Sequence, residues 1–169
     1  DIIVTDSAGA LYAERPGLTG YKKKLAQCTN VTGRSGDVLS VVEGADVLIG
    51  VSGPGTIAPA HIEAMAPQPI VFALANPIPE IMPADAKRAG AAVIATGRSD
   101  YPNQINNALV FPGLFRGALD KGVSDITEAM KLSAAHKLAK LIKKPTAKEI
   151  VPLLSDEKLV KTIASAIKK

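Results

Sequence analysis

Four short apolar runs constrain the fold of this chain more than any other feature of its sequence. They cover Ile2 to Thr5, Asp46 to Val51, Pro69 to Ala75 and Ala91 to Thr96, and each is bounded by turn-forming residues. Apolar and polar residues do not alternate within them, which is typical of strands in a parallel sheet covered by helices. The runs therefore predict parallel β-strands in the core of an α/β protein.

Helical patterns lie between these runs. We expect helices over Gly20 to Cys28, Pro59 to Ala66 and Pro83 to Ala89. Strands that alternate with helices indicate a doubly wound sheet. We therefore predict a Rossmann-like α/β fold with a mainly parallel sheet and additional helices at its C-terminal end.

The last third of the chain reads as helical. Residues 104–120 predict a helix with a break or kink at Pro112, and a longer helix is expected to end near Lys143. Ser124 or Thr127 is the expected cap of that longer helix. Its apolar stripe is predicted to contain Ala129, Leu132, Ala135, Ala139 and Ile142.

A final helix is predicted from Asp156 to Ile167, with Ser155 as its N-cap. We find no internal repeat and no convincing linker, so we expect a single folded unit. Within it, residues 1–120 are predicted to form a partial dinucleotide-binding domain, and residues 121–169 a helical extension packed on it.

Composition argues against several classes of protein. The 169 residues are 47% hydrophobic and 21% charged, as in soluble globular proteins, and no apolar run approaches the roughly 20 residues of a membrane span. We expect no signal peptide. The net charge of +4 comes with only 4% aromatic residues and no Trp, which argues against nucleic-acid binding. The single cysteine, Cys28, predicts a reducing cytoplasm and a buried, unreactive thiol.

Polar, small or rigid residues follow all four runs, in residues 6–9, 51–55, 76–80 and 97–103. In open α/β sheets, ligands bind in the crevice beyond the carboxyl ends of the strands. The convergence of these four segments is the main physical indication of a binding site.

The first two segments suggest contacts to a nucleotide. Asp6 is placed to accept a hydrogen bond from an adenosine ribose hydroxyl, although Asp-Ser-Ala-Gly is also ordinary turn chemistry. Val51, Ser52 and Gly53 offer main chain with little side-chain bulk, and a simple tight turn is the alternative. The residues from Gly50 onward do not have the spacing of the G-x-G-x-x-G phosphate-binding fingerprint.

Amide side chains mark the other two segments. Asn76 precedes Pro77, which restricts its backbone to extended conformations, although a helix-start loop is an equally good reading. Asn106 and Asn107 begin an apolar helix, where a dicarboxylate could be held by amides and the helix dipole. Capping by Asn103 or Asn106 is the alternative, and it explains one asparagine but not the cluster.

The phosphate-binding glycine turn has no counterpart after the first run. It normally lies about 20 residues before the ribose-binding acid, and here that acid is Asp6. We therefore expect that the first strand of the unit and its Gly-rich turn lie upstream of this sequence.

Four motifs together resemble the NAD-binding half of a malic enzyme of the smaller, prokaryotic type. They are VTDSAG, ADVLIGVSGPG, IVFALANPIPE and ATGRSDYPNQINNALVFPGLFRGALD, the last followed by ITEAMKLSAA. The resemblance covers residues 1 to about 140. It implies oxidative decarboxylation of malate to pyruvate and carbon dioxide, with NAD or NADP as hydride acceptor and Mg²⁺ or Mn²⁺ as Lewis acid.

The resemblance also implies residue roles. Asp6 would bind the adenosine ribose, the adjacent Ser7 would be a further cofactor-binding residue, and Val51, Ser52 and Gly53 would line the cofactor. Asn76 would contact both nicotinamide and substrate, and Asn106 and Asn107 would bind malate. The acid favours NAD, although Lys22, Lys23 or Lys24 could reach the phosphate of NADP.

No catalytic residue and no metal ligand is expected in this chain, because the catalytic tyrosine and lysine and the acidic metal ligands belong to the family's upstream half. His61 and His136 lack partners at metal-binding spacing. We expect partnership with that N-terminal half and a homodimer or higher oligomer. The alternative function is a non-catalytic nucleotide-binding or oligomerisation module.

Overall fold

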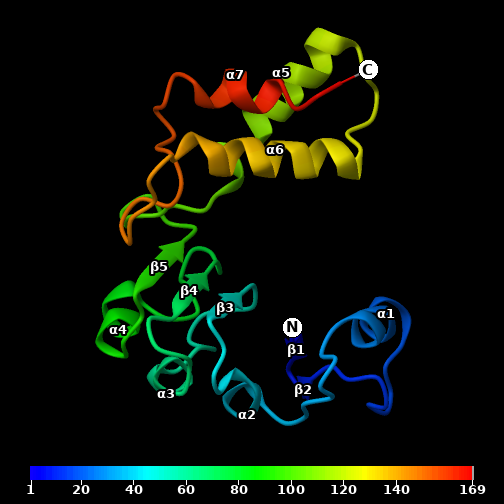
Figure 1. Ribbon diagram of the computed structural model, residues 1–169, viewed down its shortest axis with the longest axis vertical. Coiled ribbons are helices and arrows are strands. Elements are labelled where there is room, and N and C mark those ends of the chain that lie inside the picture. Colours follow the sequence, from blue (N-terminus) through cyan, green and yellow to red (C-terminus); the bar gives the residue numbers. More distant parts are fainter. Residues whose placement is uncertain (169) are drawn as a thin grey trace.

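The computed structural model describes residues 1–168, which form a sheet region and a helical region (Figure 1). The sheet region contains a three-stranded sheet and its flanking helices, and the helical region contains the helices after residue 106. A small N-terminal hairpin and the first helix lie to one side of the sheet.

The sheet consists of β3 (Val47–Gly50), β4 (Ile70–Ala73) and β5 (Val93–Thr96). All three strands are parallel, in the order β3-β4-β5. This confirms three of the four predicted strands. Figure 1 shows that the carboxyl ends of the strands point toward the helical region.

Three short helices pack against a common hydrophobic cluster with the sheet. They are α2 (Val38–Val42), α3 (Pro59–Glu63) and α4 (Pro83–Arg88). Proline in the first turn starts both α3 and α4, where its missing N–H leaves no bond unmade. These two helices are shorter than predicted. Sequence reasoning missed α2, whose N-cap Asp37 accepts a hydrogen bond from the Ser40 N–H at 2.8 Å.

The prediction for the first apolar run is wrong in its bounds and its pairing. Only Thr5–Asp6 forms a strand, β1, and it pairs antiparallel with β2 (Gly9–Ala10). The carbonyl of Ile2 accepts from the Asn30 N–H at 2.7 Å, and that of Val4 from the Leu11 N–H at 2.8 Å. The run is therefore bonded to neighbouring loops and not to β3.

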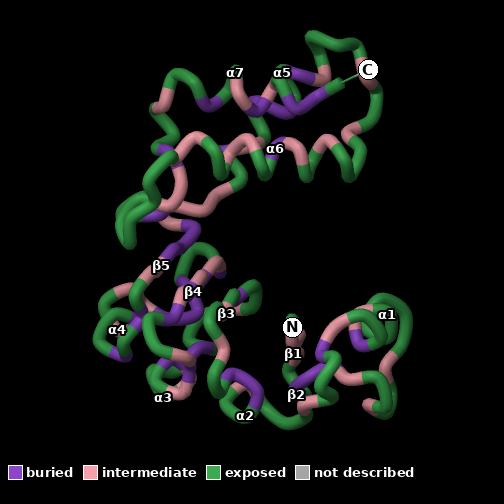
Figure 2. The backbone as a smooth tube through the Cα atoms, viewed as in Figure 1, coloured by how far each residue is buried: buried purple, intermediate pink, exposed green. Residues whose placement is uncertain are grey.

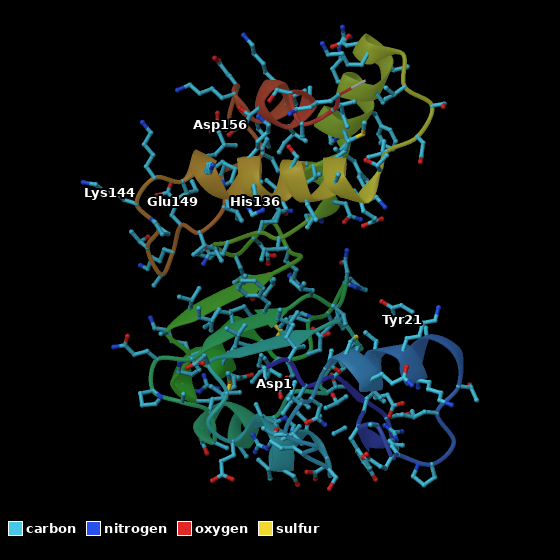
Figure 3. The ribbon with its side chains drawn as sticks, turned by 45° about the vertical axis from the view of Figure 1, so that its right-hand side comes forward. Asp1, Tyr21, His136, Lys144, Glu149 and Asp156 are labelled. Carbon is cyan, nitrogen blue, oxygen red and sulfur yellow. The ribbon has the colours of Figure 1, made fainter. Side chains whose placement is uncertain are left out.

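Helix α1 (Gly20–Cys28) has the predicted bounds and carries Tyr21 on its exposed surface (Figure 3). Cys28 at its end is exposed, so the expectation of a buried thiol is wrong. The reason is that α1 buries only one residue, Ala26, and leaves its other faces open.

None of the helices in residues 1–168 combines the length and the apolar character that a membrane crossing requires.

The helical region contains the short 3₁₀ helix η1 (Asn107–Leu109), α5 (Phe111–Lys121), α6 (Glu128–Leu141) and α7 (Leu159–Ala164). They bury a second hydrophobic cluster, which includes Leu114, Ala134 and Ile163 (Figure 2). Helices α5 and α7 approach closely at Gly113, where a Cβ atom would lie 2.5 Å from the Cβ of Ile163.

Several helix predictions need correction. Pro112 causes no kink, because it lies in the first turn of α5. Thr127 caps α6 as expected, but its buried position is Ala134, packed with Met130, Leu138 and Leu141. The predicted stripe was wrong, since Leu132 is 63% exposed. Helix α7 begins at Leu159, and the turn before it is closed by Asp156, which accepts from the Lys158 N–H at 2.8 Å.

Candidate functional site

A fully buried carboxylate joins the carboxyl ends of β3 and β4. Glu80 is 0% exposed. Its Oε1 accepts from the Ser52 N–H at 2.7 Å, and its Oε2 accepts from the Ala75 N–H at 2.9 Å. The Ser52 hydroxyl lies 3.4 Å from Oε1. Buried polar groups need such partners, so Glu80 and the two strand ends satisfy one another.

The last residue of β3 is a glycine because Glu80 occupies the space beside it. A Cβ atom on Gly50 would lie 2.7 Å from the Glu80 carboxyl carbon and 2.9 Å from its Oε1. Sequence reasoning assigned no role to Glu80. The available indication was a lone acidic residue in the apolar stretch Pro-Ile-Pro-Glu-Ile.

The loop after β3 presents hydroxyl groups at the surface. The side chains of Ser52 and Thr56 are hydrogen-bonded to each other at 2.7 Å, and Val51 is 80% exposed. Gly53 is partly buried, and its carbonyl accepts from the Thr56 hydroxyl at 2.8 Å. Since Glu80 uses the Ser52 N–H, the polar group that Ser52 offers to a ligand is its hydroxyl.

The loop after β4 carries Asn76, which is exposed and joined to Pro77 by a cis peptide bond. The carbonyl of Pro77 accepts from the Arg98 guanidinium at 3.4 Å. Arg98 also binds both carboxylate oxygens of Asp100, at 2.8 and 2.7 Å. This pairing raises the pKa of Arg98 and lowers the pKa of Asp100. Arg98 therefore links the loops that follow β4 and β5.

The asparagine cluster divides into three roles. Asn103 is buried, with its Nδ2 donating to the carbonyls of Ile94 and Ala147 (2.9 Å each) and its Oδ1 accepting from the Ile150 N–H at 3.0 Å. It thus ties β5 to the connection between α6 and α7, which Lys144 and Glu149 mark in Figure 3.

The other two asparagines differ in exposure. Asn106 donates to the Gly97 carbonyl at 3.2 Å and caps η1 by accepting from the Ala108 N–H at 3.0 Å. Its amide is therefore engaged by the fold, which agrees with the capping alternative. Asn107 is exposed at the start of η1.

Asp6 lies in the N-terminal hairpin and contacts two cations. Its oxygens accept from Arg15 at 2.8 Å and from Lys22 at 2.5 Å, and the Ala8 N–H adds a third bond at 2.9 Å. The Lys22 bond, then the Arg15 bond and then the Ala8 N–H hold the pKa of Asp6 well below its usual range. The neighbouring Ser7 is exposed.

These contacts place most of the predicted site along one edge. Glu80 joins the loop of Ser52 to the loop of Asn76. Arg98 joins the Asn76 loop to the loop after β5, and Asn106 bonds to Gly97 in the loop after β5. Within residues 1–168, no hydrogen bond or ion pair links Asp6 to this edge. Figure 1 shows its hairpin beside the sheet, on the side of β3.

Several known proteins are similar to this chain in sequence. The family model described as "Malic enzyme, NAD binding domain" matches residues 1–169. A bifunctional malic/malolactic enzyme from Bacillus subtilis is 45% identical over 172 residues, covering 100% of this chain and 42% of the relative. An NADP-dependent malic enzyme from Halomonas elongata is 39% identical, covering 99% of this chain and 43% of the relative.

A solved structure extends the similarity to three dimensions. The crystal structure of an NAD-dependent malic enzyme from Thermotoga maritima matches with a TM-score of 0.92 and 42% sequence identity, covering 98% of this chain and 44% of that one. The chain thus spans less than half the length of these relatives. Sequence, family model and fold agree, and the chain belongs to the malic enzyme NAD-binding domain family.

Proposed function

We propose that this chain is the NAD(P)-binding part of a malic enzyme that converts L-malate to pyruvate and carbon dioxide. The observation that carries the proposal is the polar edge at the carboxyl ends of β3, β4 and β5, where Ser52, Asn76 and the asparagine segment are bonded into one set of loops. This is the position at which α/β sheets bind their ligands.

The residues along this edge fit a nicotinamide dinucleotide. A bound cofactor would supply the hydride acceptor for oxidation at C2 of malate, and carbon dioxide would leave the resulting β-keto acid. The Ser52 hydroxyl and the exposed Asn76 amide supply neutral donors and acceptors suited to the cofactor's amide and hydroxyl groups. In this proposal residues 1–120 are the partial dinucleotide-binding domain that supplies these contacts, and residues 121–169 are a helical extension packed on it.

Asp6 and Ser7 are proposed to bind the adenosine ribose. A ribose hydroxyl that donates to Asp6 replaces part of the bonding by Lys22, whose side chain is 55% exposed and can move away. The carboxylate favours NAD because it repels the phosphate of NADP. Lys22 and Arg15 offset that repulsion, so NADP is the second candidate.

The substrate is proposed to lie against Asn76 and Asn107. Both side chains are exposed, and amide N–H groups bind carboxylates without adding charge to the site. Asn106 acts in this proposal mainly by fixing the turn through its bonds to Gly97 and Ala108.

Residues 1–168 contain no group of three or more His, Cys, Asp or Glu side chains that could hold a metal ion. We therefore assign no step to a metal held by this chain. The proposal places the Mg²⁺ or Mn²⁺ ligands, and the tyrosine and lysine that transfer protons, in the N-terminal half of the same enzyme.

The test uses the complete enzyme with L-malate, Mn²⁺ and either NAD or NADP. The proposal predicts malate-dependent formation of reduced nicotinamide, together with equimolar pyruvate. Binding of either cofactor without turnover would favour the non-catalytic module. The absence of both binding and turnover would contradict the proposal.

We also propose an oligomeric enzyme in the cytoplasm. Phe111, Phe115 and Leu119 lie four residues apart on α5, and their exposures are 49%, 57% and 80%. Such an apolar stripe is suited to packing against another protein surface. Light scattering of the complete enzyme tests the oligomer, and a monomer would contradict it.

The single cysteine supports the proposed location in the cytoplasm, which is a reducing compartment.

A further inference from the structure

We infer that Glu80 is a positioning residue for the cofactor edge, a role that rests on the proposed function of that edge. Its carboxylate replaces the hydrogen bonds that the sheet cannot make once β3 and β4 have ended. It thereby fixes the distance between the Ser52 loop and the Asn76 loop.

The ladder between the two strands stops just before this point. The last paired residues are Gly50 and Ala73, and the Leu74 N–H still donates to the Gly50 carbonyl at 3.1 Å. Beyond it, the N–H groups of Ser52 and Ala75 both point to Glu80. One side chain therefore continues the connection between the strands beyond the backbone ladder.

The main chain of Glu80 strengthens the same connection. Its carbonyl accepts from the Ile57 N–H at 3.2 Å, so Glu80 contacts the loop of residues 51–57 near both of its ends. The neighbours Pro79 and Ile81 are buried, which anchors Glu80 in the sheet region. Because the residue is fixed on all sides, its carboxyl group has little freedom to move.

The chemistry of the site requires a carboxylate of this length. Both partners are N–H donors, and a carboxylate offers acceptors only. A glutamine would turn its NH₂ group toward one of the two N–H groups, and an aspartate would be one carbon too short to reach both. Within residues 1–168, Glu80 forms no ion pair, so its partners are the strand ends and not a counter-ion.

This role predicts an effect on cofactor binding rather than on the chemical step. If only a fraction of the molecules has the two loops correctly spaced, the apparent affinity for the cofactor is reduced in proportion to that fraction. Bound cofactor still selects the correct spacing. Loss of one of these buried hydrogen bonds is expected to raise the KM for the cofactor by about tenfold. The kcat at saturating cofactor is expected to stay within about twofold.

The experiment compares Glu80→Gln with Glu63→Gln in the complete enzyme, because Glu63 is an exposed glutamate at the end of α3. Glu80→Gln is expected to raise the KM for the cofactor at nearly constant kcat, and Glu63→Gln to change neither. Gly50→Ala is a second, independent variant: it leaves Glu80 in place but pushes its carboxyl group away, and it should reproduce the higher KM.

Amide hydrogen exchange supplies a readout that does not depend on turnover. The Ser52 and Ala75 amides should exchange faster in Glu80→Gln than in Glu63→Gln, because they lose their acceptor. Unchanged KM and unchanged exchange at both amides would overturn the inference, as would a loss of kcat at constant KM. A wild-type enzyme that does not oxidise malate would refute the proposed function instead, and the exchange measurement would still decide the role of Glu80.

Discussion

Asp6 and Glu80 are both carboxylates near the end of a strand, but the fold stabilises them in opposite ways. Asp6 has a side chain that is 16% exposed and contacts Arg15 and Lys22. Glu80 is 0% exposed and is bonded to the backbone N–H groups of Ser52 and Ala75.

The difference fits the two proposed roles, in which Asp6 binds a ligand and Glu80 shapes the binding edge. Lys22 is half exposed and can be exchanged for a ligand hydroxyl, so Asp6 remains accessible. The partners of Glu80 are parts of the fold, and releasing them would leave buried donors without acceptors. Accessibility, and not the chemical group itself, therefore distinguishes the two roles.

The largest expected contrast is in stability. Glu80→Ala leaves the Ser52 and Ala75 N–H groups without their acceptor, which should cost about 2–4 kcal/mol of unfolding free energy. Asp6→Ala should cost less unfolding free energy, because Lys22 is half exposed and can turn to water, and Arg15 keeps its bonds to the carbonyls of Gly9 and Ala10. Thermal unfolding of the complete enzyme measures both, and an equal or larger decrease for Asp6→Ala would remove the distinction.

Of the two carboxylates, only Asp6 should influence the choice between NAD and NADP. Asp6→Ala removes both a ribose acceptor and the charge that repels a phosphate, so the preference for NAD over NADP should fall about tenfold. Glu80→Gln should weaken the binding of NAD and of NADP by the same factor. The ratio of kcat/KM values for NAD and NADP measures this, and a changed ratio in Glu80→Gln would place that residue in direct contact with the ribose end.

A smaller effect is expected at Lys22. Lys22→Ala should raise the KM for NADP about threefold, since an exposed cation contributes little, and should leave the KM for NAD nearly unchanged. Lys23 lies on the same helix without a bond to Asp6, so Lys23→Ala is the matched control. Equal KM values for NADP in the two variants would show that Lys22 does not face the phosphate.

The smallest effect concerns pH. Lys22, Arg15 and the Ala8 N–H lower the pKa of Asp6 in the folded protein, so the stability they add is complete above its unfolded pKa of about 4. That stability is lost as the pH falls below this value and Asp6 becomes protonated. The difference in unfolding temperature between wild type and Asp6→Asn should therefore be constant near pH 7 and shrink below about pH 4. A difference that grows on acidification would contradict this.

The same comparison shows what the sequence could predict. The parallel strands β3 to β5 and α1 were predictable because uninterrupted apolar runs and a regular helical pattern are local signals. The strand prediction for the first apolar run was wrong because its pairing depends on loops distant in sequence, such as the one that contains Asn30. The prediction of the buried face of α6 was wrong because several faces of a helix rich in Ala are nearly equally apolar. Packing against α7 determines which of these faces is buried.

Site residues divide in the same way. Ser52 and Asn76 are recognisable because they follow strands of the sheet, whereas Asp6 is the last residue of β1. The ligand roles of all three remain predictions. Glu80 was not recognisable, since its partners are backbone N–H groups that carry no sequence signature. Asn103 likewise gains its role from Ala147 and Ile150, more than 40 residues along the chain.

The most direct test of the central claim is amide hydrogen exchange of the complete enzyme with and without saturating NAD. Cofactor should slow exchange in the segments around Asp6, Ser52 and Asn76 together, and leave α7 unchanged. Protection confined to the helical region, or absent from the loops after β3 and β4, would contradict a cofactor site along this edge.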